Sequence, residues 1–167
     1  MGTTDSQGLR TFGAAGPYGL PAVDASELVG SATDHTVWSC IGNLTAVRSI
    51  RARVREFLTR QSYPGAVQED AELAVSELAT NALLHSRSGQ VGGVMTLFIR
   101  IDADRVRIAV ADQGEKDPDE EGVVGREDGG EYGRGKLIVE DCADRSGEYW
   151  TEATHVTWFE IDVPRSA

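Results

Sequence analysis

Residues 66–85 repeat apolar side chains at helical spacing, but a carboxylate and an amide interrupt the apolar arc. At about 100° per residue, a helix over this segment gathers on one broad arc the apolar residues Leu73, Ala74, Val75, Leu78, Ala82 and Leu84. Glu77 and Asn81 fall inside that arc, one turn apart. The predicted solvent side carries Glu69, Glu72, Ser76 and Thr80. Because a buried carboxylate without a partner costs several kcal/mol or gives up its charge, we expect a ligand or a metal ion to contact this face.

The period of the apolar residues identifies further elements on either side of this helix. HTVWSC, at residues 35–40, predicts a short strand. The helical spacing that follows it ends at residues 63–65, where Tyr-Pro-Gly breaks a helix. The period then changes to two, and residues 93–101 and 105–111, joined by a turn, predict an antiparallel hairpin.

A loop of glycine and acidic residues, 115–131, follows the hairpin and is too long for a simple connection. A third helix is predicted to begin near Lys136 and to stop at Gly147. Residues 148–153 and 155–163 then predict a closing pair of strands. This order of elements predicts an α+β fold, a two-layer sandwich with helices on one face of a mixed, mainly antiparallel sheet.

Length and composition indicate one folded domain. A chain of 167 residues is long enough to bury one full core. Residues 1–33 are rich in Gly, Ser, Thr and Ala without periodicity, so we predict a flexible tail there. The predicted domain covers residues 34–167, with the acidic loop 115–131 as a lid.

Charge and hydropathy argue against several classes of function. The formal charge of -11 disfavours direct binding to nucleic acid, which needs a basic face. No apolar run approaches the roughly 18 residues of a membrane span, and we expect no secretion signal at the amino terminus. Cys40 and Cys142, the only cysteines, spell out neither a disulfide framework nor a tetrahedral zinc site. We therefore expect a cytoplasmic protein without nucleic-acid or membrane partners.

Three local signals occur in a fixed order along the chain. The first is the pair Glu77 and Asn81, the second is Asp-Gln-Gly at 112–114 where an apolar strand ends, and the third is Gly-Arg-Gly at 133–135 before a helix. Each alone has an ordinary structural interpretation: a satisfied polar pair, a turn and a weak glycine motif. The ordered set, with a long loop between the last two, is much more specific.

This combination resembles the Bergerat-fold nucleotide-binding domain of type II topoisomerases, mismatch-repair ATPases and histidine kinases. ELATNALLH, at residues 77–85, looks like its N box, while DQG at 112–114 and GRGK at 133–136 look like its two glycine boxes. The resemblance covers residues 35–163. Within this superfamily, the chain looks most like the stand-alone anti-sigma-factor serine/threonine kinases of bacteria.

The resemblance implies ATP and Mg²⁺ as cofactors and a role for each motif residue. Asn81 would give an amide oxygen to Mg²⁺, a cation that prefers oxygen ligands, and Glu77 would act as general base. Asp112 would accept a hydrogen bond from the amino group of adenine, and Gly114 would let the backbone approach the base. His85 would lie near the phosphates, although a histidine bonded to nearby backbone at a helix end fits equally well.

The second glycine box implies a phosphate site at the start of the third helix. Backbone N–H groups near Gly133 and Gly135 would receive phosphate oxygens. Arg134 and Lys136 would add positive charge there. The chain departs from the family pattern in two places that matter for this role: Val156 stands near the position of a phosphate-binding Thr, and the lid is strongly acidic.

Two functions follow from the resemblance. The first is an anti-sigma-factor regulator that sequesters a sigma factor and phosphorylates a Ser or Thr of an antagonist protein. The alternative is a nucleotide-gated protein-binding module with little or no kinase activity. The acidic lid, Lys116 at the usual place of a second glycine in the first glycine box, and Val156 near the place of a threonine all favour it. Formation of a homodimer is left open.

Other conspicuous residues lie outside the three motifs. The arginines of the first helix form either a solvated face or a surface that attracts an acidic partner, and they are Arg48, Arg51, Arg53, Arg55 and Arg60. Trp38, Trp150 and Trp158 fall in predicted strands, and we expect them in the core.

Overall fold

The computed structural model describes residues 34–115 and 130–163. The predicted tail, 1–33, and most of the predicted lid, 116–129, lie outside the described residues. The elements are, in chain order, β1 (Asp34–Ile41), α2 (Ala46–Arg60), α3 (Gly65–His85), the short 3-10 helix η1 (Arg87–Gly89), β2 (Val94–Ile101), β3 (Arg105–Asp112), α4 (Gly130–Cys142), β4 (Arg145–Trp150) and β5 (His155–Asp162).

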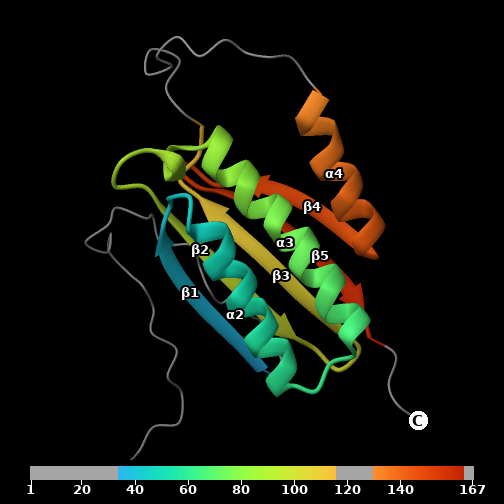
Figure 1. Cartoon of the computed structure of the whole chain (residues 1–167). Coiled ribbons are helices and arrows are strands. Elements are labelled where there is room, and N and C mark those ends of the chain that lie inside the picture. Colours follow the sequence, from blue (N-terminus) through green and yellow to red (C-terminus); the bar gives the residue numbers. More distant parts are fainter. Residues whose placement is uncertain (1–33, 116–129, 164–167) are drawn as a thin grey trace, which may run out of the picture.

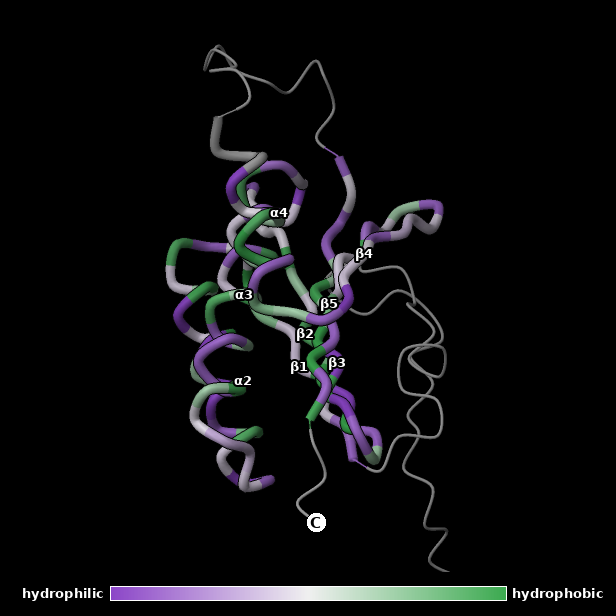
Figure 2. The backbone as a smooth tube through the Cα atoms, turned by 90° about the vertical axis from the view of Figure 1, so that its right-hand side faces the viewer, coloured by the Kyte–Doolittle hydropathy of each residue, from purple (hydrophilic) through white to green (hydrophobic). Residues whose placement is uncertain are grey.

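The strands form one sheet in the order β1-β2-β3-β5-β4, and each pairing between these neighbours is antiparallel. Helices α2, α3 and α4 cover one face of this sheet (Figure 1), and the edge-on view in Figure 2 separates the two layers. The α+β two-layer class predicted from the sequence is confirmed. Its sheet is antiparallel throughout the described part of the chain.

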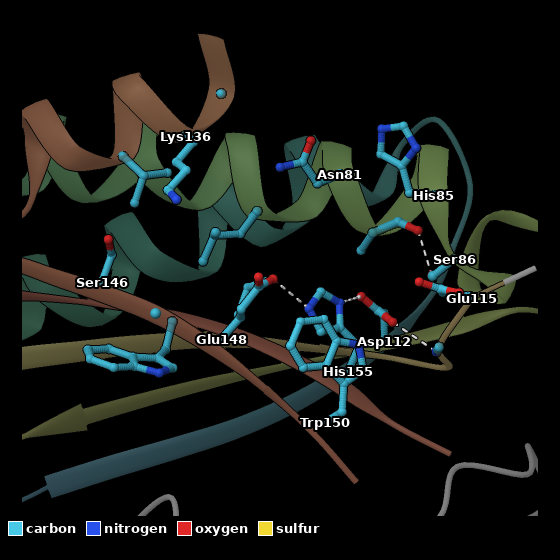
Figure 3. Close-up of a pocket in the computed structure, with 18 of the residues that line it drawn as sticks. Asn81, His85, Ser86, Asp112, Glu115, Lys136, Ser146, Glu148, Trp150 and His155 are labelled. Carbon is cyan, nitrogen blue, oxygen red and sulfur yellow. Dashed lines mark hydrogen bonds and ion pairs between the residues drawn. The ribbon is translucent and has the colours of Figure 1, made fainter. Parts of the chain in front are cut away.

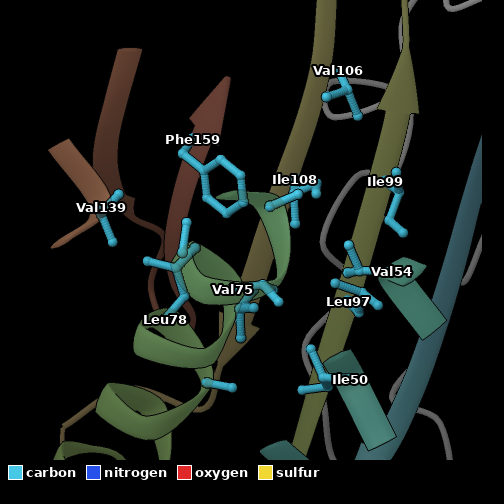
Figure 4. Packing of buried hydrophobic residues seen from close by; sticks show 14 of the residues in the cluster. Ile50, Val54, Val75, Leu78, Leu97, Ile99, Val106, Ile108, Val139 and Phe159 are labelled. Carbon is cyan, nitrogen blue, oxygen red and sulfur yellow. The ribbon is translucent and has the colours of Figure 1, made fainter. Parts of the chain in front are cut away.

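The main core lies between the helices and the sheet. A strand turns alternate side chains to the same face, so Leu97 of β2, Ile108 of β3 and Phe159 of β5 all face the helices and are buried. Val54 and Val75 meet them from α2 and α3 (Figure 4). Burying a side chain of this size stabilises the fold by about 1.5–3 kcal/mol. This core fixes where the ends of the strands stand relative to α3.

The opposite face of the sheet carries a smaller cluster that mixes apolar and charged groups. Phe98 and Val156 are buried there. The guanidinium of Arg107 lies 4.1 Å from the ring centroid of Trp158, and its Nη1 is 3.2 Å from a carboxylate oxygen of Glu160. This cluster lies on the side of the sheet that the helices do not cover.

Helix α3 is rotated relative to the face predicted from the sequence. It packs against both α2 and α4, so it has two buried sides instead of one. Glu72, predicted on the solvent side, is buried against α2, where Arg55 Nε donates to its Oε1 at 2.6 Å. Leu73 and Leu84, predicted in the buried arc, are 48% and 53% exposed. Glu77 is half-buried and faces α4.

Helix α4 begins earlier and ends earlier than predicted. It starts at Gly130 rather than near Lys136, so Gly133 lies in its first turn and Gly135 in its second. It ends at Cys142, and Gly147, the predicted stop, lies inside β4 instead. A Cβ atom at Gly147 would come within 2.8 Å of the Trp158 ring, so the glycine serves a close approach of that ring rather than a helix end.

Candidate functional site

A pocket of about 410 Å³ opens between α3, α4 and the sheet (Figure 3). This volume lies in the range of small-molecule sites. Most of the residues predicted for the site line the pocket, namely Asn81, His85, Asp112, Gly114, Gly135 and Lys136. They come from α3, from the end of β3 and from α4, so the fold brings three distant sequence segments to one place.

At Gly135 the backbone of α4 lies close to two side chains of α3. A Cβ atom at this position would lie 2.9 Å from Glu77 Oε2 and 3.7 Å from the Asn81 amide nitrogen. Both α3 side chains therefore point at the α4 backbone, one turn apart. A larger residue here would push the flexible end of the Glu77 side chain aside.

Glu77 itself is not among the described residues that line the pocket, whereas Asn81 is. The carboxylate predicted as a general base thus lies beside the pocket, between α3 and α4. Arg134 is exposed and does not line the pocket in the described structure, while Lys136 does. His85 lines the pocket from the exposed C-terminal end of α3, as Figure 3 shows.

The loop after β3 is fixed by hydrogen bonds to its neighbours. The Gln113 N–H donates to Ser88 Oγ at 2.9 Å, and Gln113 Oε1 accepts from the Val94 N–H at 2.8 Å. The Gly114 carbonyl accepts from the Arg87 N–H at 2.9 Å. Gly114 has a φ of 80°, a left-handed conformation that favours glycine. These bonds hold the end of β3 in one conformation.

Asp112, the last residue of β3, is 3% exposed, yet it lines the pocket. Its Oδ1 accepts from the Gly114 N–H at 2.9 Å, and its Oδ2 lies 3.1 Å from Nδ1 of His155. An ionised carboxylate is an acceptor only, with about four lone-pair sites. The side chain is therefore held from two sides and can still accept from a group in the pocket.

His155 is a site residue that the sequence analysis missed. It is the first residue of β5, directly opposite Asp112, and its Nε2 lies 2.9 Å from Glu148 Oε2. The hydrogen bond to Asp112 is the main cause that raises the pKa of His155 above its ordinary value. The two-residue period of β5 could have indicated it. His155, Thr157 and Phe159 lie on the same face of this strand, the one that meets the helices.

Trp150 completes this side of the pocket and corrects its predicted place in the core. It is 58% exposed at the end of β4, and its ring stacks on His155 with centroids 4.6 Å apart and planes at 19°. Trp38, by contrast, packs against the core as expected. The exposed indole leaves one aromatic surface at the pocket rim.

The threonines near Val156 occupy two different environments. Val156 is fully buried in the small cluster on the far face of the sheet, so it does not contribute to the pocket. Thr157 lines the pocket. The Oγ1 of Thr154 is buried without a hydrogen-bond partner in the described part of the chain, beside Ala153, whose carbonyl packs against Gly114. Thr154 itself is not among the described residues that line the pocket.

The sequence profile of a protein family, the histidine kinase-like ATPase domain, matches residues 42–158, which include all three motifs. This chain belongs to that family. Among solved structures, the chain is similar to the RsbU and RsbW domains of Rv1364c from Mycobacterium tuberculosis, with a TM-score of 0.60 and 17% identity. The match covers 79% of this chain and 33% of that one, so it shows a shared fold only. No curated protein matches the chain.

Membership of the histidine kinase-like ATPase domain family implies ATP binding. The pocket contains a buried hydrogen-bond acceptor at Asp112 and a cation at Lys136. No helix in the described ranges, 34–115 and 130–163, is long and apolar enough to cross a lipid bilayer.

The described residues around the pocket offer few ligands for a metal ion. Among the described residues, no group of three or more His, Cys, Asp or Glu side chains is arranged to hold a metal ion. Mg²⁺ commonly takes only one or two protein ligands together with phosphate oxygens and water. Asn81, which lines the pocket, would fit such a role with its amide oxygen.

Proposed function

We propose that this chain binds Mg-ATP between α3, α4 and the β3–β5 end of the sheet and acts as an anti-sigma-factor regulator. It sequesters a sigma factor and transfers the γ-phosphoryl group of ATP to a Ser or Thr of an antagonist protein. The observation that carries the proposal is the convergence of three motif segments on one pocket. Asn81 comes from α3, Asp112 and Gly114 from the end of β3 and the loop after it, and Gly135 from α4.

The base of the nucleotide is recognised at Asp112. Because its carboxylate only accepts hydrogen bonds, it favours the exocyclic amino group of adenine over the carbonyl oxygen of guanine. Gly114 contributes an open approach, since a Cβ atom there would have no neighbour closer than 3.6 Å. This arrangement selects ATP over GTP.

The phosphates lie toward α4. Lys136 lines the pocket and supplies positive charge, Arg134 adds charge from the surface, and the N–H of Gly133 belongs to the first turn, where helix amides lack an internal partner. Gly135 keeps α4 close to α3. Asn81 provides an amide oxygen to Mg²⁺, which neutralises phosphate charge when bound.

Glu77 takes the proton of the acceptor hydroxyl in the kinase reaction. A bond forms between that hydroxyl oxygen and the γ-phosphorus, the bond from the γ-phosphorus to the bridging oxygen breaks, and ADP leaves. Such transfer depends mainly on positioning and electrostatics. A base contributes about 10²–10⁴-fold in rate.

The partners are those of the anti-sigma-factor kinases that the chain resembles: a sigma factor and an antagonist protein, with a homodimer as a further form. A sigma-factor partner implies a cytoplasmic location. The arginines of α2 do not by themselves define its binding surface. Arg51 and Arg55 reach Glu72, Arg53 lies 4.8 Å above the Trp38 ring, and Arg60 pairs with Glu56. These contacts assign most of the arginine face an intramolecular role.

A second function is favoured by the position of Glu77. This carboxylate faces Gly135 and does not line the pocket of the described structure. ATP binding therefore does not depend on Glu77, and the chain can bind the nucleotide without a catalytic base. In a nucleotide-gated binding module, ATP would set the arrangement of α4 against α3, and partner capture would need no phosphoryl transfer.

A transfer assay separates the two functions. The full chain is incubated with γ-labelled ATP and a candidate antagonist protein, with Glu77→Ala beside wild type. We expect label on the antagonist with wild type and a loss of at least about 100-fold with the variant. Equal transfer by both chains would remove Glu77 from the reaction.

Thr80→Ala serves as the matched control, because Thr80 is also half-buried on α3 but does not line the pocket. It should transfer at the wild-type rate. Capture of the sigma factor by a chain that binds ATP but never transfers label would favour the binding module.

A further inference from the structure

His155 stands between two carboxylates at the edge of the pocket. Its Nδ1 lies 3.1 Å from Asp112 Oδ2, and its Nε2 lies 2.9 Å from Glu148 Oε2 (Figure 3). The stacked Trp150 ring covers one face of the imidazole. Three strands, β3, β4 and β5, therefore fix this side chain.

Both contacts are hydrogen bonds only when both ring nitrogens carry a proton. A carboxylate accepts and does not donate, and a neutral imidazole has a single N–H. The neutral ring would thus lose one of the two bonds. Burial of the ring lowers the pKa of His155, but the hydrogen bonds to the two carboxylates raise it more. The pKa is therefore raised, and the bond to Asp112 is the largest cause.

The bond from His155 fixes the orientation of Asp112. One oxygen of this carboxylate is held by the Gly114 N–H at 2.9 Å and the other by His155. With both oxygens anchored, the carboxylate cannot rotate about its terminal torsion, which is otherwise broad. The remaining lone pairs keep a constant direction relative to the pocket.

We propose that His155 is a positioning residue for nucleotide recognition: by bridging Asp112 and Glu148 it holds the acceptor of the nucleobase in place, and nucleotide binding weakens when the ring loses its second proton. This inference rests on the proposed ATP binding. It adds a residue of this chain, outside the three sequence motifs, to the specificity of the site.

Other charged groups also line the pocket and enter any pH dependence. Asp112 on β3 and Glu148 on β4 bond the ring directly. From the remaining elements the pocket is faced by His85 on α3, Glu115 after β3, and Lys136 and Glu140 on α4. Of these, His85 is the other histidine that lines the pocket.

The test measures the affinity of the full chain for Mg-ATP by calorimetry between about pH 6 and about pH 9. For wild type we expect the affinity for Mg-ATP to fall in one step, by about three- to tenfold, as pH rises. The step occurs because the His155 ring loses its second proton and with it one charge-assisted hydrogen bond. His155→Gln should bind more weakly at low pH and lack this step. Glu148→Gln, an exposed position on an edge strand, should move the step to lower pH, because it removes one carboxylate that holds the proton.

Two control variants isolate the role of His155. Glu140→Gln removes the same charge from the pocket without touching the ring, and it should leave the midpoint of the step unchanged. His35→Gln removes a histidine from the opposite edge strand and should leave the whole profile unchanged. Titration of the phosphates of ATP is common to all chains and cancels in the comparison.

The outcomes separate this inference from the proposed function. A midpoint that moves in Glu148→Gln but not in Glu140→Gln supports the positioning role. If His155→Gln and wild type bind ATP with the same affinity and the same pH profile, the role of His155 is overturned while ATP binding stands. If wild type binds no ATP at any pH, the proposed function fails and this inference fails with it.

Discussion

Two of the carboxylates on helix α3, five residues apart, face different neighbours. Glu72 faces α2, is 6% exposed, and is held by Arg55 at 2.6 Å and by Arg51 at 3.7 Å. Glu77 faces α4, is half-buried, and lies against the backbone of Gly135. Glu72 is thus ion-paired with two arginines, whereas Glu77 packs against a residue that has no side chain.

This difference separates a structural side of the helix from a functional side. Breaking an ion pair at a buried carboxylate leaves unpaired charge and lowers stability. A carboxylate beside a pocket contributes little to stability and remains available for chemistry. Substitutions on the α2 side should therefore change stability and spare nucleotide binding, and substitutions on the α4 side should do the reverse.

The largest effect is expected for Asn81→Ala on the α4 side. Loss of the amide oxygen removes the proposed protein ligand of Mg²⁺ and should weaken Mg-ATP binding by about 100-fold, or about 2.7 kcal/mol. Thermal unfolding should be nearly unchanged, since Asn81 is only half-buried. Calorimetric titration and a melting curve on the same sample measure both quantities. A large loss of stability with intact binding would reverse the assignment of the two sides.

On the α2 side, Glu72→Gln should lower the free energy of unfolding by about 2 kcal/mol, because Arg55 loses its charged acceptor. The affinity for ATP should stay at the wild-type value. Denaturant titration measures the change, and Glu69→Gln, an exposed position on the same helix, should stay within about 0.5 kcal/mol. Equal effects at the two positions would show that the ion pair with Arg55 does not stabilise the fold.

A smaller effect is expected where the two helices touch. Gly135→Ala places a methyl group 2.9 Å from Glu77 Oε2, and the flexible carboxylate must shift. Phosphoryl transfer should fall by about tenfold, because misplaced catalytic groups lose rate steeply. Stability should be unchanged or slightly higher, since alanine favours a helix by about 0.5–1 kcal/mol.

Gly65→Ala is the matched control for Gly135→Ala. A Cβ atom at Gly65, at the start of α3, has no neighbour within 4 Å. This variant should transfer phosphate like wild type. Loss of transfer in both variants would mean that the contact at Gly135 has no special role.

Local patterns in the sequence were sufficient to predict the elements and the three motifs. The period-two segments became β2 and β3 within one residue, and the helix predicted over 66–85 became α3. Asn81, Asp112 and Gly135 do line one pocket. The elements depend on short-range periodicity, which neighbouring residues determine, whereas the meeting of the three motifs at one pocket was implied by the resemblance to the Bergerat-fold domain.

The remaining features depend on contacts between distant segments. A helical wheel assumes one buried side, so it placed Glu72 in solvent, although α3 packs between α2 and α4. His155 was missed because its partner Asp112 is set by the register of β3 with β5, and no local pattern specifies that register. The start of α4 at Gly130 was likewise hidden, since glycines at 130, 133 and 135 disfavour a helix by intrinsic propensity.

The most direct test of the central claim is a calorimetric titration of the full chain with Mg-ATP and with Mg-GTP, using wild type and Asp112→Asn. The account predicts that wild type binds ATP at one site and binds GTP at least about tenfold more weakly, the cost of an unpaired acceptor at Asp112. Asp112→Asn, whose amide can also donate, should narrow this preference. Absence of ATP binding at millimolar concentration, or equal binding of the two nucleotides by wild type, would contradict the account.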